Sequence, residues 1–398
     1  MDITISPGKL SGTVNAIPSK SQAHRLLICA AFADAPASLF CPDTNRDIEA
    51  TADCLRALGA DIQRTEAGYR VKPVENVPKT AILDCCESGS TLRFMLPIAG
   101  ALGVDTVFQM AGRLPERPLC PLWEEMQRMG CILSRPSADT IRCQGKLIPG
   151  EYRIDGGVSS QFITGLLFAA ALMDGHSHIH ITGKLESKPY VDMTRQALGL
   201  FQVDTEGFVV KGGQGFRSPG DMIVEGDWSN GAFFLAAKAL GNEIAVKNLN
   251  EQSPQGDKAA AQLLPQLRKH LTISAADIPD LVPILAIVAG ANQGAVFTDI
   301  RRLRLKESDR VASVIRMITA LGGGAEADEN TLTVYPSHYL GGTVDAENDH
   351  RIAMAAAIGA TVCQGSVTIL DAQCVSKSYP KFWEEYRRLG GNYEQHLR

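Results

Sequence analysis

The sequence predicts a two-domain α/β fold built from six copies of one strand–helix–strand–helix–strand unit. Three recurring features predict it: a polar start leading into an apolar helix, a short alternating strand, and an amphipathic helix ending near glycine. The polar starts fall at residues 19, 88, 159, 227, 278 and 348. Successive starts differ by 69, 71, 68, 51 and 70 residues, so we expect three copies per domain and one shortened copy, between 227 and 278.

Each element of the unit has its own signature. The first helix is apolar almost all round, as in L-F-A-A-A-L (167–172), and should therefore be buried. The strand that follows alternates, as in G-S-V-T-I-L (365–370). The second helix ends at a glycine that supplies a left-handed cap, as in L-R-A-L-G-A (55–60). A linker between the domains is expected in the Gly/Pro-rich stretch G-F-R-S-P-G-D-M (215–222).

Composition excludes several classes of protein. A net charge of -5 does not favour a nucleic-acid partner, and no apolar run approaches the length needed to span a bilayer. The first ten residues lack the features of a signal peptide, and the ten cysteines include no C-x-x-C pair. We therefore expect a cytoplasmic protein with reduced thiols and no membrane partner.

Cationic side chains crowd the starts of the apolar helices, most clearly in P-S-K-S-Q-A-H-R (18–25). Ordinary N-capping explains the serines and aspartates at these starts. It does not explain Lys20, Arg25, Arg93 and Arg351, because the helix dipole disfavours cations at an N-terminus. The sequence therefore predicts a site for a strongly anionic small molecule.

Three histidines, His176, His178 and His180, alternate and so share one face of a predicted strand. A zinc site is one interpretation. The same strand in other copies, such as D-T-V-F (105–108), carries no metal ligands, and no fourth ligand is nearby in the sequence. We expect an exposed strand face and no metal.

A series of motifs in one order identifies a family resemblance. The motifs are P-S-K-S-Q-A-H-R, S-G-S-T-L-R, E-R-P, S-S-Q-F, S-K-P-Y-V-D-M-T, D-I-P-D, L-R-L-K-E-S-D-R, N-D-H-R-I-A-M-A and K-S-Y-P-K-F-W. They resemble the EPSP synthase (3-phosphoshikimate 1-carboxyvinyltransferase) family from residue 18 to 383. The resemblance implies a two-domain inside-out α/β barrel of six βαβαββ repeats. It assigns residues 1–14 and 225–398 to the first domain and 15–224 to the second.

The implied reaction transfers the enolpyruvyl group of phosphoenolpyruvate to the 5-hydroxyl of shikimate 3-phosphate and releases phosphate. Both substrates carry a phosphate and a carboxylate, which explains the many lysines and arginines. The resemblance implies no metal or organic cofactor, and a monomer whose partners are these two small molecules.

The resemblance also implies roles for individual residues. The catalytic ones would be Lys20, Asp280 and Glu307. Phosphoenolpyruvate would be bound by Lys20, Gly89, Arg117, Gln161, Arg310, Arg351 and Lys377. Shikimate 3-phosphate would be bound by Ser21, Arg25, Ser159, Ser160, Gln161, Ser187, Asp280 and Lys306. For Glu307 the alternative to catalysis is a surface i,i+3 ion pair with Arg310. For Arg93 two roles stay open, which are binding the ligand and holding the site together.

One departure and two alternative functions stay open. Cys86-Glu87 precedes S-G-S-T where the family often has Gly-Asn, which leaves affinity for the inhibitor glyphosate undetermined. UDP-N-acetylglucosamine enolpyruvyl transferases have a reactive cysteine before an Arg-Pro pair, whereas Cys120 follows Arg117-Pro118, which disfavours that activity. The other alternative is a non-catalytic phosphometabolite-binding protein.

Overall fold

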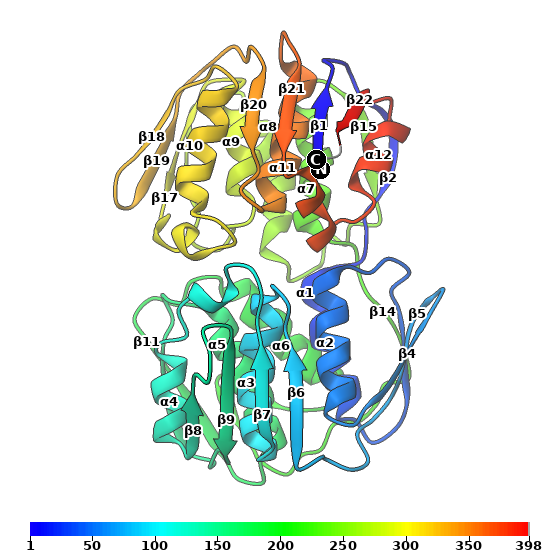
Figure 1. Cartoon of the computed structure of the whole chain (residues 1–398), viewed down its shortest axis with the longest axis vertical. Coiled ribbons are helices and arrows are strands. Elements are labelled where there is room, and N and C mark those ends of the chain that lie inside the picture. Colours follow the sequence, from blue (N-terminus) through cyan, green and yellow to red (C-terminus); the bar gives the residue numbers. More distant parts are fainter. Residues whose placement is uncertain (397–398) are drawn as a thin grey trace. The chain divides into compact units, whose positions relative to one another are not determined.

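The computed structural model describes residues 1–396, and its chain divides into two compact units (Figure 1). Unit 1 comprises Met1–Ile17 and Glu225–Arg398, and unit 2 comprises Pro18–Val224. The first boundary falls three residues later than the expected division after residue 14. The reason is that β2 (Ser11–Asn15) pairs in parallel with β15 (Glu243–Lys247), and the Ala16 N–H then donates to the Lys247 carbonyl.

The segment expected to be a linker, 215–222, is instead part of unit 2. Strand β14 (Asp221–Ile223) begins inside it and pairs in parallel with β3 (Ala37–Phe40). The chain therefore leaves unit 2 only after Val224.

Unit 2 contains the first three repeats. The first contributes α1 (Lys20–Ala31), β3, α2 (Arg46–Ala57), β4 (Asp61–Thr65) and β5 (Gly68–Lys72). The second contributes β6 (Thr80–Asp84), α3 (Gly89–Leu102), β7 (Asp105–Gln109), α4 (Leu122–Arg128), β8 (Cys131–Ser134) and β9 (Thr140–Gly145). The third contributes β10 (Glu151–Asp155), α5 (Ser160–Leu172), β11 (Ser177–Thr182), α6 (Lys188–Leu200), β12 (Thr205–Glu206) and β13 (Val209–Val210).

Unit 1 contains the other three. The fourth contributes α7 (Trp228–Ala239), β15 and α8 (Ala260–Gln266). The fifth contributes β16 (Leu271–Ser274), α9 (Val282–Gly290), β17 (Ala295–Thr298), α10 (Arg310–Ala320), β18 (Ala325–Ala327) and β19 (Thr331–Val334). The sixth contributes β20 (Gly342–Asp345), α11 (His350–Gly359), β21 (Val367–Leu370), α12 (Phe382–Arg388) and β22 (Tyr393–His396). Unit 1 also contains the short 3-10 helices η2 (Gly256–Ala259), η3 (Arg301–Leu305), η4 (Ala360–Val362) and η5 (Ala372–Lys377), whereas η1 (Leu114–Glu116) lies in unit 2.

Complete repeats share one strand order, exemplified by β6-β7-β9-β8, in which the first two strands are parallel and the other pairs antiparallel. Three strands are exchanged along the chain. β1 (Asp2–Ile5) completes the sixth repeat, β2 supplies the first strand of the fourth, and β14 supplies the first strand of the first. The fourth repeat keeps only the pair β15-β2 among the described residues, which explains its short spacing.

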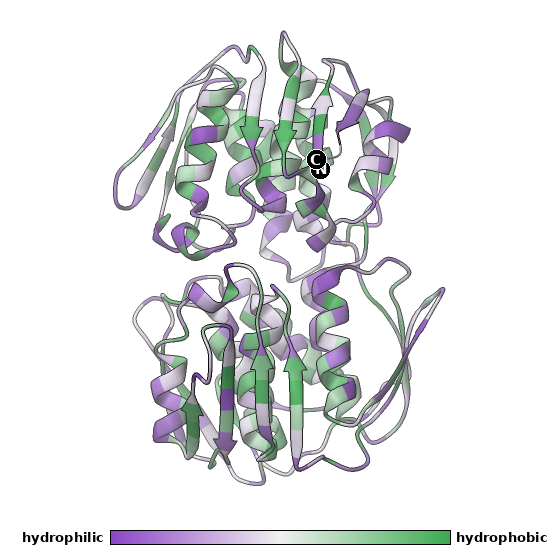
Figure 2. Ribbon diagram, in the orientation of Figure 1, coloured by the Kyte–Doolittle hydropathy of each residue, from purple (hydrophilic) through white to green (hydrophobic). Residues whose placement is uncertain are grey.

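Helices form the core of each unit, and the sheets surround them. Every residue of α9 and α11 is buried, and α3 and α5 pack against each other. Outer helices such as α4 and α12 carry hydrophilic residues (Figure 2). This is the expected inside-out α/β arrangement, although the strands of residues 1–396 form six separate sheets and none closes into a barrel. Within the same residues, no helix combines the length and apolar character needed to cross a membrane.

Candidate active site

Capping side chains begin five of the six central helices. Each accepts a hydrogen bond from a backbone N–H two or three residues later, and the capping residues are Ser19, Ser88, Ser159, Asp227 and Asp349. These caps satisfy N–H groups that the helix itself leaves unpaired. Because the caps are made by the chain, the cations beside them are the feature that indicates a ligand.

In unit 2, two arginines and a glutamine surround the start of α3. A Cβ added to Gly89 would lie 2.7 Å from Arg93 Nη1 and 2.7 Å from Arg117 Nη1. Arg93 Nη1 donates to Gln161 Oε1 at 3.0 Å, and Gln161 Nε2 donates to Ser90 Oγ at 2.9 Å. A side chain at position 89 would crowd the ends of both arginines, so glycine leaves room for two guanidinium groups at this helix N-terminus. Arg93 also donates to the Pro118 carbonyl, so it has an architectural contact as well.

Arg25 joins three helices of unit 2, because it lies on α1, contacts α6, and donates from Nη2 to Thr164 Oγ1 on α5 at 3.4 Å. It donates from Nε to Thr194 Oγ1 at 2.9 Å, from Nη2 to the Tyr190 carbonyl at 2.8 Å and from Nη1 to the Ser21 carbonyl at 2.6 Å. These acceptors are neutral, and burial lowers the pKa of the guanidinium to about 10. Ser160 and Ser187, also predicted to bind, are buried at the starts of α5 and α6.

Lys20 lies in the first turn of α1 and donates to Asp47 Oδ2 at 2.8 Å. Both side chains are partly exposed, at 15% and 16%. His24, one turn further, shares a hydrogen bond of 2.7 Å with Thr51 inside the helical core. Burial, with the charges of Lys20 and Arg25, holds the pKa of His24 well below its usual value, so the ring is neutral.

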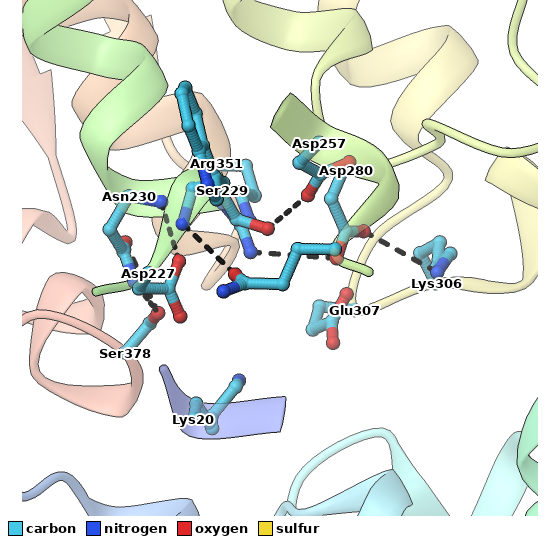
Figure 3. A network of polar contacts seen from close by, with 12 residues as sticks. Lys20, Asp227, Ser229, Asn230, Asp257, Asp280, Lys306, Glu307, Arg351 and Ser378 are labelled. Atoms are coloured by element: carbon cyan, nitrogen blue, oxygen red, sulfur yellow. Dashed lines mark hydrogen bonds and ion pairs between the residues drawn. The ribbon is translucent and has the colours of Figure 1, made fainter. Parts of the chain in front are cut away.

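In unit 1, three cations converge on Asp280, just before α9, and Figure 3 shows two of them, Lys306 and Arg351. Its Oδ1 lies 2.6 Å from Arg310 Nη1 and 3.4 Å from Lys306 Nζ, and its Oδ2 lies 3.4 Å from Arg351 Nη2. Burial alone would raise the pKa of Asp280, but the three positive charges outweigh it and hold the pKa well below its ordinary value. Burial lowers the pKa of Lys306, which Asp280 partly offsets.

Arg310 is buried among three carboxylates. Besides Asp280, it contacts Glu307 Oε2 at 2.6 Å and Asp349 Oδ2 at 2.8 Å. Its side chain is 1% exposed, so the i,i+3 contact with Glu307 is no ordinary surface pair. Burial opposes the charge of Arg310, but the carboxylates raise its pKa well above the ordinary value.

Arg351 combines burial with incomplete hydrogen bonding. It is 3% exposed, and its Nε and Nη1 have no hydrogen-bond partner among residues 1–396. Lys377, at the end of η5, donates to the Asn348 carbonyl at 2.9 Å and is 7% exposed. A buried guanidinium with unsatisfied donors fits an anionic ligand, because leaving such donors unpaired is costly.

Three acidic residues of these clusters were not predicted from the sequence, namely Asp47, Asp257 and Asp349. Asp257 accepts a hydrogen bond from Ser229 Oγ (Figure 3), and burial followed by the charge of Asp280 raises its pKa to about 7. The position of Asp349 directly before a helix was a readable signal for a cap. Nothing local in the sequence indicates that Asp47 meets Lys20, since they belong to different helices.

Cys120 bears on the alternative sugar-nucleotide activity, and Glu87 is the residue that departs from the family's motif. Cys120 is exposed, and its thiol lies 2.8 Å from Glu124 Oε1, which raises the pKa of the thiol. It is therefore a poor nucleophile. Glu87 lies over Gly112, where an added Cβ would meet its Oε2 at 2.5 Å.

Solved structures define the class of fold. EPSP synthase from Acinetobacter baumannii superposes with a TM-score of 0.81 at 21% identity, over 99% of this chain and 100% of that chain. The enolpyruvyl transferase NikO from Streptomyces tendae superposes with a TM-score of 0.77 at 17% identity, over 100% and 99%. The protein thus has the fold of the enolpyruvyl transferases.

Sequence comparison narrows this class to one family. The family model of EPSP synthase (3-phosphoshikimate 1-carboxyvinyltransferase) matches residues 5–386. The chain is 37% identical to the 3-phosphoshikimate 1-carboxyvinyltransferase of Clostridium beijerinckii, over 99% of this chain and 98% of that relative. It is 38% identical to the enzyme of the same name from Clostridium kluyveri, with the same coverage. The chain belongs to the EPSP synthase family.

Proposed function

We propose that this protein transfers the carboxyvinyl group of phosphoenolpyruvate to the 5-hydroxyl of shikimate 3-phosphate and releases phosphate. Family membership supports the reaction, and the observation that carries the mechanism is Asp280, a carboxylate kept ionised by Lys306, Arg310 and Arg351. A base that is ionised at neutral pH beside cations suits deprotonation of a hydroxyl on an anionic substrate.

The reaction consists of an addition and an elimination. The 5-hydroxyl oxygen bonds to C2 of phosphoenolpyruvate as Asp280 takes its proton, and a proton is delivered to the methylene carbon. The tetrahedral intermediate then loses a proton from the new methyl group and expels phosphate, which restores the double bond. We assign the proton transfers at carbon to Glu307 and Lys20. No redox step occurs, and we propose that no cofactor takes part.

Substrate binding would itself increase the basicity of Asp280. In the free protein, three cations depress the pKa of this carboxyl. Phosphate and carboxylate groups that bind to Lys306 and Arg351 would neutralise part of that positive charge. The pKa of Asp280 would then rise, and the carboxylate would become a stronger base only when substrate is present.

The binding roles follow the clusters described above. Phosphoenolpyruvate is assigned to Lys20, Gly89, Arg117, Gln161, Arg310, Arg351 and Lys377. Shikimate 3-phosphate is assigned to Ser21, Arg25, Ser159, Ser160, Gln161, Ser187, Asp280 and Lys306. The unsatisfied donors of Arg351 and the arginine pair at Gly89 support anionic ligands most directly. We further propose that the protein acts as a cytoplasmic monomer.

Phosphate release tests the proposed function. Incubated with both substrates, the protein should release phosphate at a rate that depends on each of them. Phosphate production with UDP-N-acetylglucosamine in place of shikimate 3-phosphate would indicate the sugar-nucleotide activity, which the raised pKa of Cys120 already disfavours. Binding of both substrates without phosphate above background would contradict the proposal and favour the non-catalytic alternative.

Glu307→Gln should lower kcat by about 10²–10⁴-fold while changing the KM of either substrate by less than about threefold. The amide keeps the size of the side chain but gives up its role in proton transfer. Asp280 and Asp349 still compensate Arg310, so the fold should persist. Glu329→Gln, an exposed partner of Arg301, is the matched control and should leave both constants unchanged. An unchanged kcat in Glu307→Gln would remove this residue from the mechanism.

A further inference from the structure

A cluster of two histidines and one glutamate lies on the outer face of the third repeat, where neither substrate has been assigned. Strands β10 and β11 are parallel, with Glu151 opposite His178 and Arg153 opposite His180. Residues paired in this way project from the same face of a sheet. The intervening residues Tyr152 and Ile179 are 1% exposed each, so the opposite face packs into the core and the cluster faces solvent.

The donor atoms of the cluster converge. Glu151 Oε2 contacts His180 Nε2 and lies 3.5 Å from His178 Nδ1, and the three donor atoms all lie within 4.8 Å of one another. Metal bonds of about 2.0–2.2 Å place tetrahedral donor atoms about 3.3 Å apart. The Glu151 side chain is 65% exposed, so it is free to move outward by the small distance that an ion between the three groups requires.

The backbone beneath the cluster is well fixed. Arg128 on α4 donates to the Glu151 carbonyl, and the Arg153 N–H donates to Glu125 Oε1 at 2.6 Å. His178 and His180 stand two residues apart on one regular strand, with ring centroids 3.7 Å apart. Ligands held on paired strands lose little freedom when they bind an ion.

We propose that Glu151, His178 and His180 bind one divalent transition-metal ion such as Zn²⁺, with solvent in the remaining position. Two imidazoles and one carboxylate form a donor set that binds such ions in preference to Mg²⁺ or Ca²⁺. No metal was expected from the sequence, because the equivalent strands carry no ligands and no further ligand lies near the histidines in the sequence. The missing ligand, Glu151, comes from the neighbouring strand 27 residues earlier than His178.

The ion would have a structural role. β10 runs from Glu151 to Asp155 before the chain reaches Ser159, the cap of α5. At about 3.3 Å per residue, the cluster lies about 13 Å from the other end of this strand. The ion would tie β10 to β11 and stabilise unit 2 without touching the reacting groups. This inference does not depend on the proposed function.

Calorimetric titration of the chelator-treated full-length protein with Zn²⁺ tests the proposal. We expect one ion per chain with micromolar affinity, binding at least tenfold weaker in Glu151→Gln, and loss of that binding in the His178→Ala/His180→Ala double variant. Zn²⁺ should raise the Tm of the unmodified protein but not that of the double variant. The substituted side chains are substantially exposed, so the variants should fold, which circular dichroism verifies.

Two controls make the result specific. His338→Ala removes an exposed histidine from unit 1 and should leave zinc binding unchanged. Arg153→Gln removes a positive charge next to the cluster and should tighten binding. All variants keep the exposed thiols of Cys86 and Cys120, so zinc held by those thiols persists in every variant. Equal affinity and stoichiometry in the unmodified protein and the double variant, or no zinc binding up to millimolar concentration, would overturn the proposal.

Discussion

Asp280→Asn is expected to lower kcat by about 10²–10⁴-fold while shikimate 3-phosphate binds at least as tightly as before. The amide has nearly the same shape but accepts no proton at neutral pH. Removing the negative charge also strengthens the positive field of Lys306, Arg310 and Arg351, which lie within 3.4 Å of this carboxylate. A phosphate group that takes over part of the compensation then gains affinity.

The split between kcat and affinity separates a base from a structural residue. If Asp280 only positioned its neighbours, its loss would weaken substrate binding together with turnover. Single-turnover phosphate release and calorimetric binding of shikimate 3-phosphate measure the two effects separately. Asp277→Asn, an exposed acid on the same loop, is the matched control and should leave both unchanged. A kcat within about threefold of the original value would exclude Asp280 as the base.

Substrate should also stabilise Asp280→Asn more than the unmodified protein. The variant leaves buried cations without one of their carboxylates, and such uncompensated charge is costly. A bound phosphate supplies the missing negative charge. The rise in Tm on adding shikimate 3-phosphate should therefore be larger for the variant.

Asp349→Ala should destabilise unit 1 by about 3–5 kcal/mol, the cost expected when a buried ion pair loses one partner. Asp349 is fully buried, contacts Arg310 Nε at 2.8 Å, accepts from Ser308 Oγ at 3.1 Å, and caps α11 through the Arg351 N–H at 2.9 Å. Asp280 and Glu307 still contact Arg310, but neither replaces the cap.

Urea unfolding followed by tryptophan fluorescence measures this loss of stability in unit 1. Trp228 and Trp383 lie in unit 1 and Trp123 in unit 2, so a Trp123→Phe background makes the fluorescence report on unit 1. Asp309→Ala removes the cap of α10 from a carboxylate that is 40% exposed, and should cost only about 1 kcal/mol. Asp349→Asn, which keeps a capping oxygen, should fall between the two. Equal losses for Asp349→Ala and Asp309→Ala would show that the buried pair contributes nothing beyond a cap.

Much of the architecture was predictable because its causes are local. Apolar helices with polar starts, alternating strands and helix-ending glycines follow from side-chain periodicity and backbone preference, and their spacing revealed the repeats. The family and its reaction were also predictable, since motifs such as L-R-L-K-E-S-D-R and N-D-H-R-I-A-M-A stand in the expected order. The cationic residues Lys20, Arg25, Arg93 and Arg351 were also recognisable from local sequence. The helix dipole disfavours a positive charge near a helix N-terminus, so their positions required another explanation.

Long-range pairing was not predictable from the repeats. The strand before α1, β2, pairs with β15 from residue 243 onward, and β14, the strand before α7, pairs with β3. Backbone hydrogen bonds between strands do not depend on which side chains the strands carry. The repeat pattern alone therefore does not say which copy a strand completes. This exchange moves the boundary of unit 1 to Ile17 and places the start of β14 at the end of the expected linker.

The sequence by itself determined the repeats, the buried helices, the family and the cationic helix starts. Only the tertiary structure decided how those charges are compensated. It brought Asp280 and Asp349 to Arg310, left Nε and Nη1 of Arg351 without hydrogen-bond partners among residues 1–396, and set Glu151 beside His178 and His180. The physical reason is that a charge is stabilised by whatever lies within a few ångströms in space, and partners 30, 39 and 71 positions apart reach that distance only after folding.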